Sequence, residues 1–410
     1  MQHNLDSERP QPLQGVIVAD FSRVLAGPSA SMLLADLGAD VIKVERPGTG
    51  DDTRTWGPPY RGQTSTYFLG TNRGKRSIAL DLKDPADQEV ARQLAVEADV
   101  LIENFLPGTL DRSGLGYDQL RDHNPGLVYC SVTGFGSAAG ARRPGYDFIA
   151  QAAGGLMSIT GEEGGEPMKV GVALVDVITG LHATIAILAA LRGRETTGLG
   201  HHIEVNLLSS ILSAMSNQSS AFVAAGVVPS RLGNRHPSVA PYQLIRTADR
   251  SVAIGCGNNQ QFRALCHALN APALADEPRF ASNRDRVENL PALQKELSLV
   301  AASVASEDVL AQLEAAGVPC APVNTIEEAF ALAEQLGLEP IQHLDTGTDA
   351  LPQVSPPFRF DGRAVPVRGA PPGLGEQGEE IRAWLATATA RRGADALEAG
   401  TDDVADRGNS

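Results

Sequence analysis

The sequence predicts an α/β protein built around a parallel sheet that is covered by helices. Short apolar runs of strand type alternate with longer segments whose apolar residues recur at helical spacing. This alternation, with short links, is typical of parallel sheets that carry helices on both faces. A chain of 410 residues is also long enough for two domains.

The expected elements follow one another in the N-terminal half. Strands are expected at residues 15–21, 41–45, 76–82, 99–105 and 126–136. Helices are expected at residues 27–40, 84–98 and 177–192, the last one long and buried. Residues 201–223 have the pattern of a strand that runs into a helix.

The composition changes near residue 225, where Gly and Pro become frequent. "SVAIGCG" (251–257) then begins what is expected to be a smaller α+β unit. A second Pro/Gly-rich break at 356–378 precedes a last helix at 379–388. Residues 391–410 hold too few apolar side chains to pack, so we expect a disordered tail.

Charge and cysteine content limit the function classes. With 34 basic and 49 acidic side chains the formal net charge is −15, so nucleic acid and anionic membranes are not expected as partners. The apolar stretch 170–191 is broken by Asp176, Gly180 and His182, which argues against a membrane span. Four scattered cysteines and an N-terminus without an apolar signal segment indicate a cytoplasmic protein with neither disulfide framework nor metal site.

Motifs for the common chemistries of α/β proteins are missing. After the first strand the chain has "SRVLAGP" (22–28) in place of the GxGxxG turn that binds a dinucleotide pyrophosphate. "GTNRGKR" (70–76) is one residue short of a phosphate loop and lacks the Ser or Thr that would hold magnesium. GxSxG and HExxH do not occur. An NAD-binding protein is therefore a disfavoured alternative.

Asp176 is an unusual residue because it lies in an almost continuously apolar stretch. An isolated buried carboxylate is normally hydrogen-bonded, paired, neutralised or kept for chemistry. Asp is also a favoured N-cap, and a helix is expected from Val177 onward. A helix N-terminus favours an ionised carboxylate, so capping and catalysis are compatible. Spacing alone leaves both roles open.

Several stretches, in order, resemble the class III coenzyme A transferases (CaiB/BaiF-like). They are residues 12–54, 72–85, 98–116, 124–136, 144–161, 171–191, 257–262 and 317–325, within about residues 12–375. "DDTRTWGPPY" (51–60) and "GEPMKVGVALVD" (165–176) are most similar to the succinate–hydroxymethylglutarate (dicarboxylate) CoA-transferases. The resemblance implies a Rossmann-like large domain (12–225 and 335–390), a small domain with linkers (226–334) and an interlocked, ring-shaped homodimer.

The resemblance also implies an activity. Asp176 would be the nucleophile, and CoA would move from succinyl-CoA or glutaryl-CoA to a dicarboxylic acid through an aspartyl-CoA thioester. No permanently bound cofactor is expected, since coenzyme A and acyl-CoA are substrates. By the same resemblance, the CoA contacts would be Val24, Arg46, Leu80, Lys83, Asn104, Phe105, Arg112 and Tyr146. The cations expected to meet the distal carboxylate of a diacid are Arg54, Lys169 and His236.

An α-methylacyl-CoA racemase of the same fold is the alternative. Racemases of this kind need a His base in a Gly-His-Asp stretch. Here that stretch is "PGYDF", with Tyr146 in place of the histidine, so the racemase is ranked second. A CoA-binding protein without chemistry would have no need of Asp176. Leu25, where formyl-CoA transferases carry Gln, disfavours a formate/oxalate pair.

Overall fold

The computed structural model describes residues 11–346 and 350–391, which form two compact units. Unit 1 contains residues 11–154, 171–219 and 339–391, and unit 2 contains residues 155–170 and 220–338. The sequence analysis placed 155–170 in the large domain, whereas it groups with unit 2. The expected tail lies outside the described residues from 392 onward.

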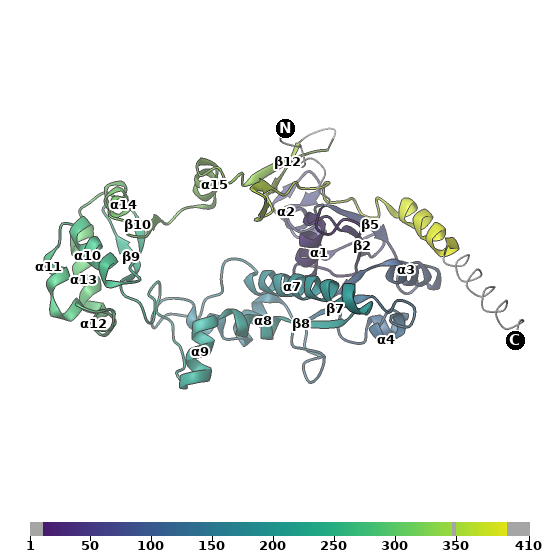
Figure 1. The fold of residues 1–410 in the computed structure, drawn as a ribbon, viewed down its shortest axis with the longest axis horizontal. Coiled ribbons are helices and arrows are strands. Elements are labelled where there is room, and N and C mark those ends of the chain that lie inside the picture. Colours follow the sequence, from purple (N-terminus) through teal and green to yellow (C-terminus); the bar gives the residue numbers. More distant parts are fainter. Residues whose placement is uncertain (1–10, 347–349, 392–410) are drawn as a thin grey trace, which may run out of the picture. The chain divides into compact units, whose positions relative to one another are not determined.

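Unit 1 is built on a six-stranded sheet in which all neighbouring strands are parallel (Figure 1). Their spatial order is β5 (Lys75–Ala79), β2 (Asp40–Glu45), β1 (Ile17–Asp20), β6 (Val100–Glu103), β7 (Val128–Thr133) and β8 (His202–Asn206). This is the order of a doubly wound Rossmann-type sheet, whose winding reverses between β1 and β6. The expected parallel sheet is confirmed.

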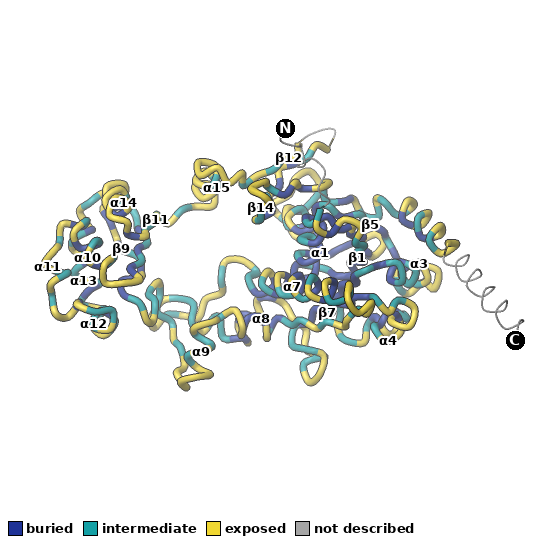
Figure 2. Tube along the Cα trace, in the orientation of Figure 1, coloured by how far each residue is buried: buried dark blue, intermediate teal, exposed yellow. Residues whose placement is uncertain are grey.

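Helices cover both faces of the sheet. On one face, α3 (Pro85–Glu97) and the helical residues 378–391 share a core with alternate strand residues. The residues of this core include Ala19, Ile42, Ile78, Leu94, Leu101, Ile381 and Leu385. Strand neighbours such as Val18 and Val41 point to the opposite face by the period of two, where α1 (Ala26–Asp36) packs on β1, β2 and β6. Figure 2 shows these strands among the buried parts of unit 1.

The long apolar helix α7 (Leu174–Thr197) packs on α1, β7 and β8. By length and composition it could cross a membrane, but half of its most apolar window is buried inside the protein. Its buried residues include Val175, Thr179, Ala183 and Ile187. Core helices of soluble proteins show the same combination, and α7 fills that role in unit 1.

Shorter elements complete unit 1. They are η1 (Asp52–Thr55), β3 (Tyr60–Arg61), β4 (Thr64–Ser65), α2 (Thr66–Leu69), η2 (Leu110–Ser113), α4 (Tyr117–Leu120), α5 (Asp147–Ala153), α8 (Leu207–Ala214), β12 (Ile341–Asp345), β13 (Ala350–Val354), β14 (Arg359–Phe360) and β15 (Arg363–Ala364). Helix α9 (Ser216–Ala225) begins in unit 1 and ends in unit 2.

Unit 2 is the expected α+β unit. Its antiparallel sheet has the order β11 (Cys320–Pro322), β10 (Ser251–Gly255), β9 (Tyr242–Arg246). Its helices are α6 (Leu156–Ile159), α10 (Asn259–Ala268), α11 (Ala273–Asp276), η3 (Pro278–Phe280), α12 (Asn283–Glu288), α13 (Leu290–Ala301), α14 (Ser306–Ala315) and α15 (Ile326–Gln335). Arg286 is fully buried in its core, where the guanidinium donates to Ala240 and Phe280 carbonyls and lies over the Phe262 ring.

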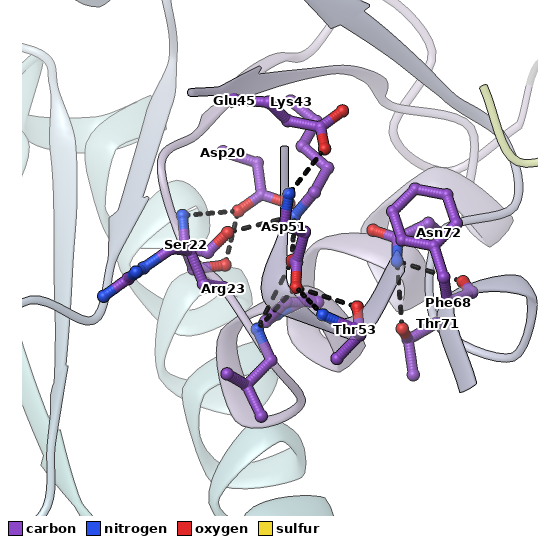
Figure 3. Close-up of polar contacts among 12 residues, drawn as sticks. Asp20, Ser22, Arg23, Lys43, Glu45, Asp51, Thr53, Phe68, Thr71 and Asn72 are labelled. Carbon is purple, nitrogen blue, oxygen red and sulfur yellow. Dashed lines mark hydrogen bonds and ion pairs between the residues drawn. The ribbon is translucent and has the colours of Figure 1, made fainter. Parts of the chain in front are cut away.

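Four charged side chains are buried together in unit 1, and Figure 3 shows three of them, Asp20, Lys43 and Asp51. Lys43 Nζ lies 2.8 Å from Asp51 Oδ2, and Lys75 Nζ lies 3.0 Å from Asp20 Oδ2, with all four side chains 0% exposed. Burial alone would raise the pKa of Asp20, but Lys75 and Lys43 outweigh it and lower that pKa to about 2. The carboxylates stay ionised, and opposite charges compensate one another within the core.

Replacing Lys43 with Met should therefore destabilise unit 1 strongly, because Asp51 would keep a buried charge without its cation. We expect a loss of about 3–5 kcal/mol in the free energy of unfolding, measured by denaturant titration. Arg92→Ala is the control, since it removes an exposed pair with Glu89 that is worth about 1 kcal/mol or less. A Lys43→Met variant as stable as Arg92→Ala would contradict a structural role for the buried charges.

Candidate active site

A cavity of about 200 Å³ opens in unit 1 where the winding of the sheet reverses. It is lined by residues 23–26 after β1, residues 104–107 after β6, much of 132–146 after β7, and by Asp52, Asp176 and Leu207. Doubly wound sheets bind ligands at this point because neighbouring loops turn to opposite faces of the sheet there. We call it the Asp176 cavity.

Asp176 is the third residue of α7, whose N-cap is Ala173. The helix therefore begins three residues before the expected Val177, and Asp176 lies inside its first turn. The carboxylate that caps this turn belongs to Asp147, whose Oδ1 accepts from the N–H of Val175 at 2.8 Å and of Asp176 at 3.3 Å. The capping interpretation of Asp176 is thus wrong, because a carboxylate from another helix, α5, satisfies these donors.

Asp147 and Asp176 form a pair of buried carboxylates, 9% and 8% exposed. Burial raises the pKa of Asp176 to about 7, and the negative charge of Asp147 adds to the rise. Tyr67 of α2 lies in the same field, and burial followed by Asp176 and Asp147 raises its pKa to about 12. A carboxylate with a pKa near neutrality is more basic, and hence a better nucleophile, than an ordinary aspartate.

The loop after β1 has an unusual conformation. Val24 has a φ of 71°, in the left-handed region that β-branched residues rarely adopt. Asn104 holds the residue before it, since its Oδ1 accepts from Arg23 N–H at 2.8 Å and its Nδ2 donates to the Arg23 carbonyl at 2.7 Å. The Val24 N–H donates to Asp51 at 3.3 Å, which ties the loop to the buried Lys43–Asp51 pair (Figure 3). Backbone strain of this kind is concentrated at functional sites.

A second cavity, of about 760 Å³, shares Arg23 and Phe105 with the Asp176 cavity. We call it the larger cavity. The residues predicted to contact CoA divide between the two. Val24, Asn104, Phe105 and Tyr146 line the Asp176 cavity, and Arg46, Leu80, Lys83, Phe105 and Arg112 line the larger one. The structure thus places every predicted CoA contact in one of two cavities with common walls.

Arg54 is not available as a substrate contact. Its Nε and Nη2 donate to the Glu45 carboxylate at 2.7 and 2.6 Å, and Nη2 also donates to the Pro372 carbonyl. The guanidinium lies 3.8 Å from the centre of the Phe68 ring. Because Nε and Nη2 are bound to Glu45 and the guanidinium packs on Phe68, Arg54 is a structural cation, and the expectation that it binds a substrate carboxylate is corrected. Lys169 and His236 belong to unit 2, so the geometry of unit 1 leaves their role a prediction.

Four residues of the site were not predicted from the sequence: Arg23, Tyr67, Arg143 and Asp147. A signal existed for Asp147, since it directly follows Tyr146 in "PGYDF" and opens a short helix. Nothing in the local sequence distinguishes Arg23 and Arg143 from ordinary surface charges. Among the described residues, no group of three or more His, Cys, Asp or Glu side chains is placed to hold a metal ion.

Comparisons with known proteins agree along most of the chain. The family model "CoA-transferase family III" matches residues 13–378. Succinyl-CoA:glutarate CoA-transferase of Mus musculus is 42% identical over 380 residues, which cover 92% of this chain and 87% of the relative. Succinate–glutarate CoA-transferase of Agrobacterium fabrum is 42% identical over 388 residues, 92% of this chain and 97% of the relative.

A solved structure supports the same assignment. The crystal structure of a CaiB/BaiF family protein from Brucella suis matches with a TM-score of 0.81 at 43% identity, covering 92% of this chain and 100% of that one. Sequence, fold and family model therefore agree over nearly the whole length. The chain belongs to CoA-transferase family III and is a class III CoA-transferase.

Proposed function

We propose that this enzyme transfers CoA from succinyl-CoA or glutaryl-CoA to a dicarboxylic acid, with Asp176 as the nucleophile. The observation that carries the proposal is a buried carboxylate of raised pKa at the switch point of a doubly wound sheet. The choice of diacids is supported by the two relatives named above, which act on succinyl-CoA or succinate and on glutarate.

In the first half-reaction, a carboxylate oxygen of Asp176 attacks the thioester carbonyl of the donor. The C–S bond breaks, CoA leaves as the thiolate, and a mixed anhydride joins Asp176 to the acyl group. The thiolate then attacks the aspartyl carbonyl and expels the donor acid as its carboxylate, which leaves an aspartyl-CoA thioester. Burial favours these steps because a poorly hydrated carboxylate is a stronger nucleophile than a solvated one.

In the second half-reaction, the acceptor carboxylate attacks the aspartyl thioester and expels CoA thiolate, forming a second mixed anhydride. The thiolate attacks the acyl carbonyl of this anhydride, which yields the new acyl-CoA and returns Asp176 as a carboxylate. Each step exchanges an acyl C–S bond for an acyl C–O bond or the reverse, and over the full cycle one thioester is broken and one is formed. No oxidant, reductant or bound cofactor is needed.

The larger cavity is proposed to hold the nucleotide end of CoA. Arg46, Lys83 and Arg112 supply positive charge there, which an enzyme of net charge −15 must concentrate locally to bind phosphates. The pantetheine arm would pass Phe105, which lines both cavities, to bring the thioester to Asp176. Three carboxylates also line this cavity. Glu45 and Asp51 are already paired with Arg54 and Lys43, and Asp81 accepts the backbone N–H of Lys83.

A racemase remains the weaker candidate because it requires a proton-transfer base beside the carboxylate. Tyr146 occupies the position expected for that base and lines the Asp176 cavity. Among the described residues that line this cavity, none is a histidine.

Asp176→Asn and Asp176→Ala should each lower turnover by at least about a thousandfold while CoA binding persists. Because a raised pKa means that ionised Asp176 costs folding free energy at neutral pH, Asp176→Asn should also unfold at a higher temperature at pH 8.

Mass spectrometry of acyl-CoA-treated wild-type enzyme, trapped with hydroxylamine or borohydride, should place the adduct on the peptide containing Asp176. Near wild-type turnover in either variant would exclude the covalent mechanism.

The pH dependence should report the same carboxylate. Since only ionised Asp176 attacks, kcat/KM should fall about tenfold per pH unit below about 7 and level off above it. Asp147→Asn keeps an oxygen to cap α7 but removes the charge, so the midpoint should move to lower pH. A midpoint that does not move would show that the charge of Asp147 does not act on the nucleophile.

A homodimer is proposed as the working form. Both units expose large apolar side chains that a single chain leaves in water. They include Leu181, Ile185 and Leu212 in unit 1, and Phe222, Val223, Val228 and Ile326 in unit 2. The family resemblance implies interlocked rings, which separate only on unfolding. Sedimentation velocity should therefore show a dimer of about twice 43.1 kDa that persists on dilution to nanomolar protein, and reversible dissociation would argue against interlocking.

A further inference from the structure

A diacid substrate carries a second carboxylate, and the protein must supply a cation for it. The need is acute in the Asp176 cavity, because Asp176 and Asp147 would repel another anion brought close to them. Arg54 is excluded by its bonds to Glu45. The choice of a cation for the distal carboxylate rests on the proposed function. The candidates are the charged residues that line the Asp176 cavity.

Four charged residues line the Asp176 cavity within the described part of the chain: Arg23, Asp52, Arg143 and Asp176. Arg23 is already compensated, since its Nη1 lies 3.3 Å from Asp52 Oδ2 and its guanidinium lies over the Phe105 ring. It also lines the larger cavity, where the acidic phosphates of CoA would approach. Arg23 is therefore shared between the two cavities.

Arg143 differs from Arg23 in having no carboxylate at ion-pair distance among the described residues. Its guanidinium carbon lies 5.9 Å from the centre of the Phe135 ring. An exposed guanidinium on the wall of a small cavity, without an acidic neighbour, is a receptor for a carboxylate, since its paired N–H groups match the two oxygens.

The loop that carries Arg143 is closed at its base. A Cβ built on Gly134 would lie 2.6 Å from the Cα of Gly145, so the two strands of the loop touch at these glycines. The Arg143 N–H donates to the Gly140 carbonyl at 2.9 Å, which fixes the turn just before it. Arg143 is thus presented by a defined loop at the carboxyl end of β7, three residues before Tyr146.

We propose that Arg143 is the specificity-determining residue for diacids, and that it binds the distal carboxylate of the donor acyl group and of the acceptor in turn. One cation can serve both because the two acids occupy the same side of Asp176 in successive half-reactions. The small cavity suits a short acid, while the larger cavity takes the bulk of CoA.

The test compares Arg143→Gln with Arg142→Gln, a matched loss of charge at the neighbouring exposed residue, which does not line the cavity. The acceptors are glutarate and pentanoate, which have the same chain length and differ in the distal carboxylate. In ping-pong kinetics, kcat/KM for the acceptor is independent of the donor step. Arg143→Gln should lower this constant about 10- to 100-fold for glutarate and change it less than about twofold for pentanoate. Arg142→Gln should change neither.

A charge reversal gives a result that damage to the loop cannot produce. Arg143→Glu should lose glutarate as an acceptor and gain 5-aminopentanoate, whose terminal ammonium would meet the new carboxylate, by about tenfold over wild type. If wild-type enzyme itself showed no preference for glutarate over pentanoate, the proposed diacid function would fail and this inference with it. If wild type preferred glutarate but Arg143→Gln kept that preference, the inference alone would be overturned and the proposed function would stand.

Discussion

The buried ion pair between Lys43 and Asp51 is the interaction on which the site depends. Neither side chain is exposed, so the pair is stabilised by its own charges, by the nearby charges of Asp20 and Glu45 and by the hydrogen bonds around it. Lys43 Nζ also donates to the Ser22 carbonyl, and Asp51 receives the Val24 N–H. The loop after β1 is thereby anchored at two points, on either side of Arg23, and this loop lines both cavities.

The Asp147–Asp176 pair works in the opposite sense, because here like charges are held close together. Asp147 is fixed by the N-terminal N–H groups of α7 and by Gln151, so it can remain near Asp176 despite the repulsion. Backbone hydrogen bonds from the first turn of α7 thus offset the repulsion between Asp147 and Asp176. The gain is a carboxylate whose basicity suits attack on a thioester.

In the proposed mechanism, the two cavities divide the recognition of an acyl-CoA between them. The larger one gathers Arg46, Lys83 and Arg112 from three separate segments of the chain, whereas the smaller one holds Asp176 and Arg143. Phe105 and Arg23 stand at the boundary. A substrate that reaches across this boundary would have its phosphates and its acyl group bound by different loops, which lets acyl specificity vary without loss of CoA binding.

The sequence by itself determined the α/β class and the order of the main strands and helices, because periodicity and short motifs are carried by neighbouring residues. It also singled out Asp176 as a candidate nucleophile, a carboxylate within an apolar stretch. By family resemblance it also predicted the CoA contacts, which stay predictions. It could not show that Asp147 caps α7 or that Glu45 forms an ion pair with Arg54. Nor could it show that Asn104 hydrogen-bonds the backbone of Arg23, 81 residues away. Only the tertiary structure decided these points, since burial and through-space charge set the pKa of Asp176 and the availability of each cation, and neither can be read from local sequence.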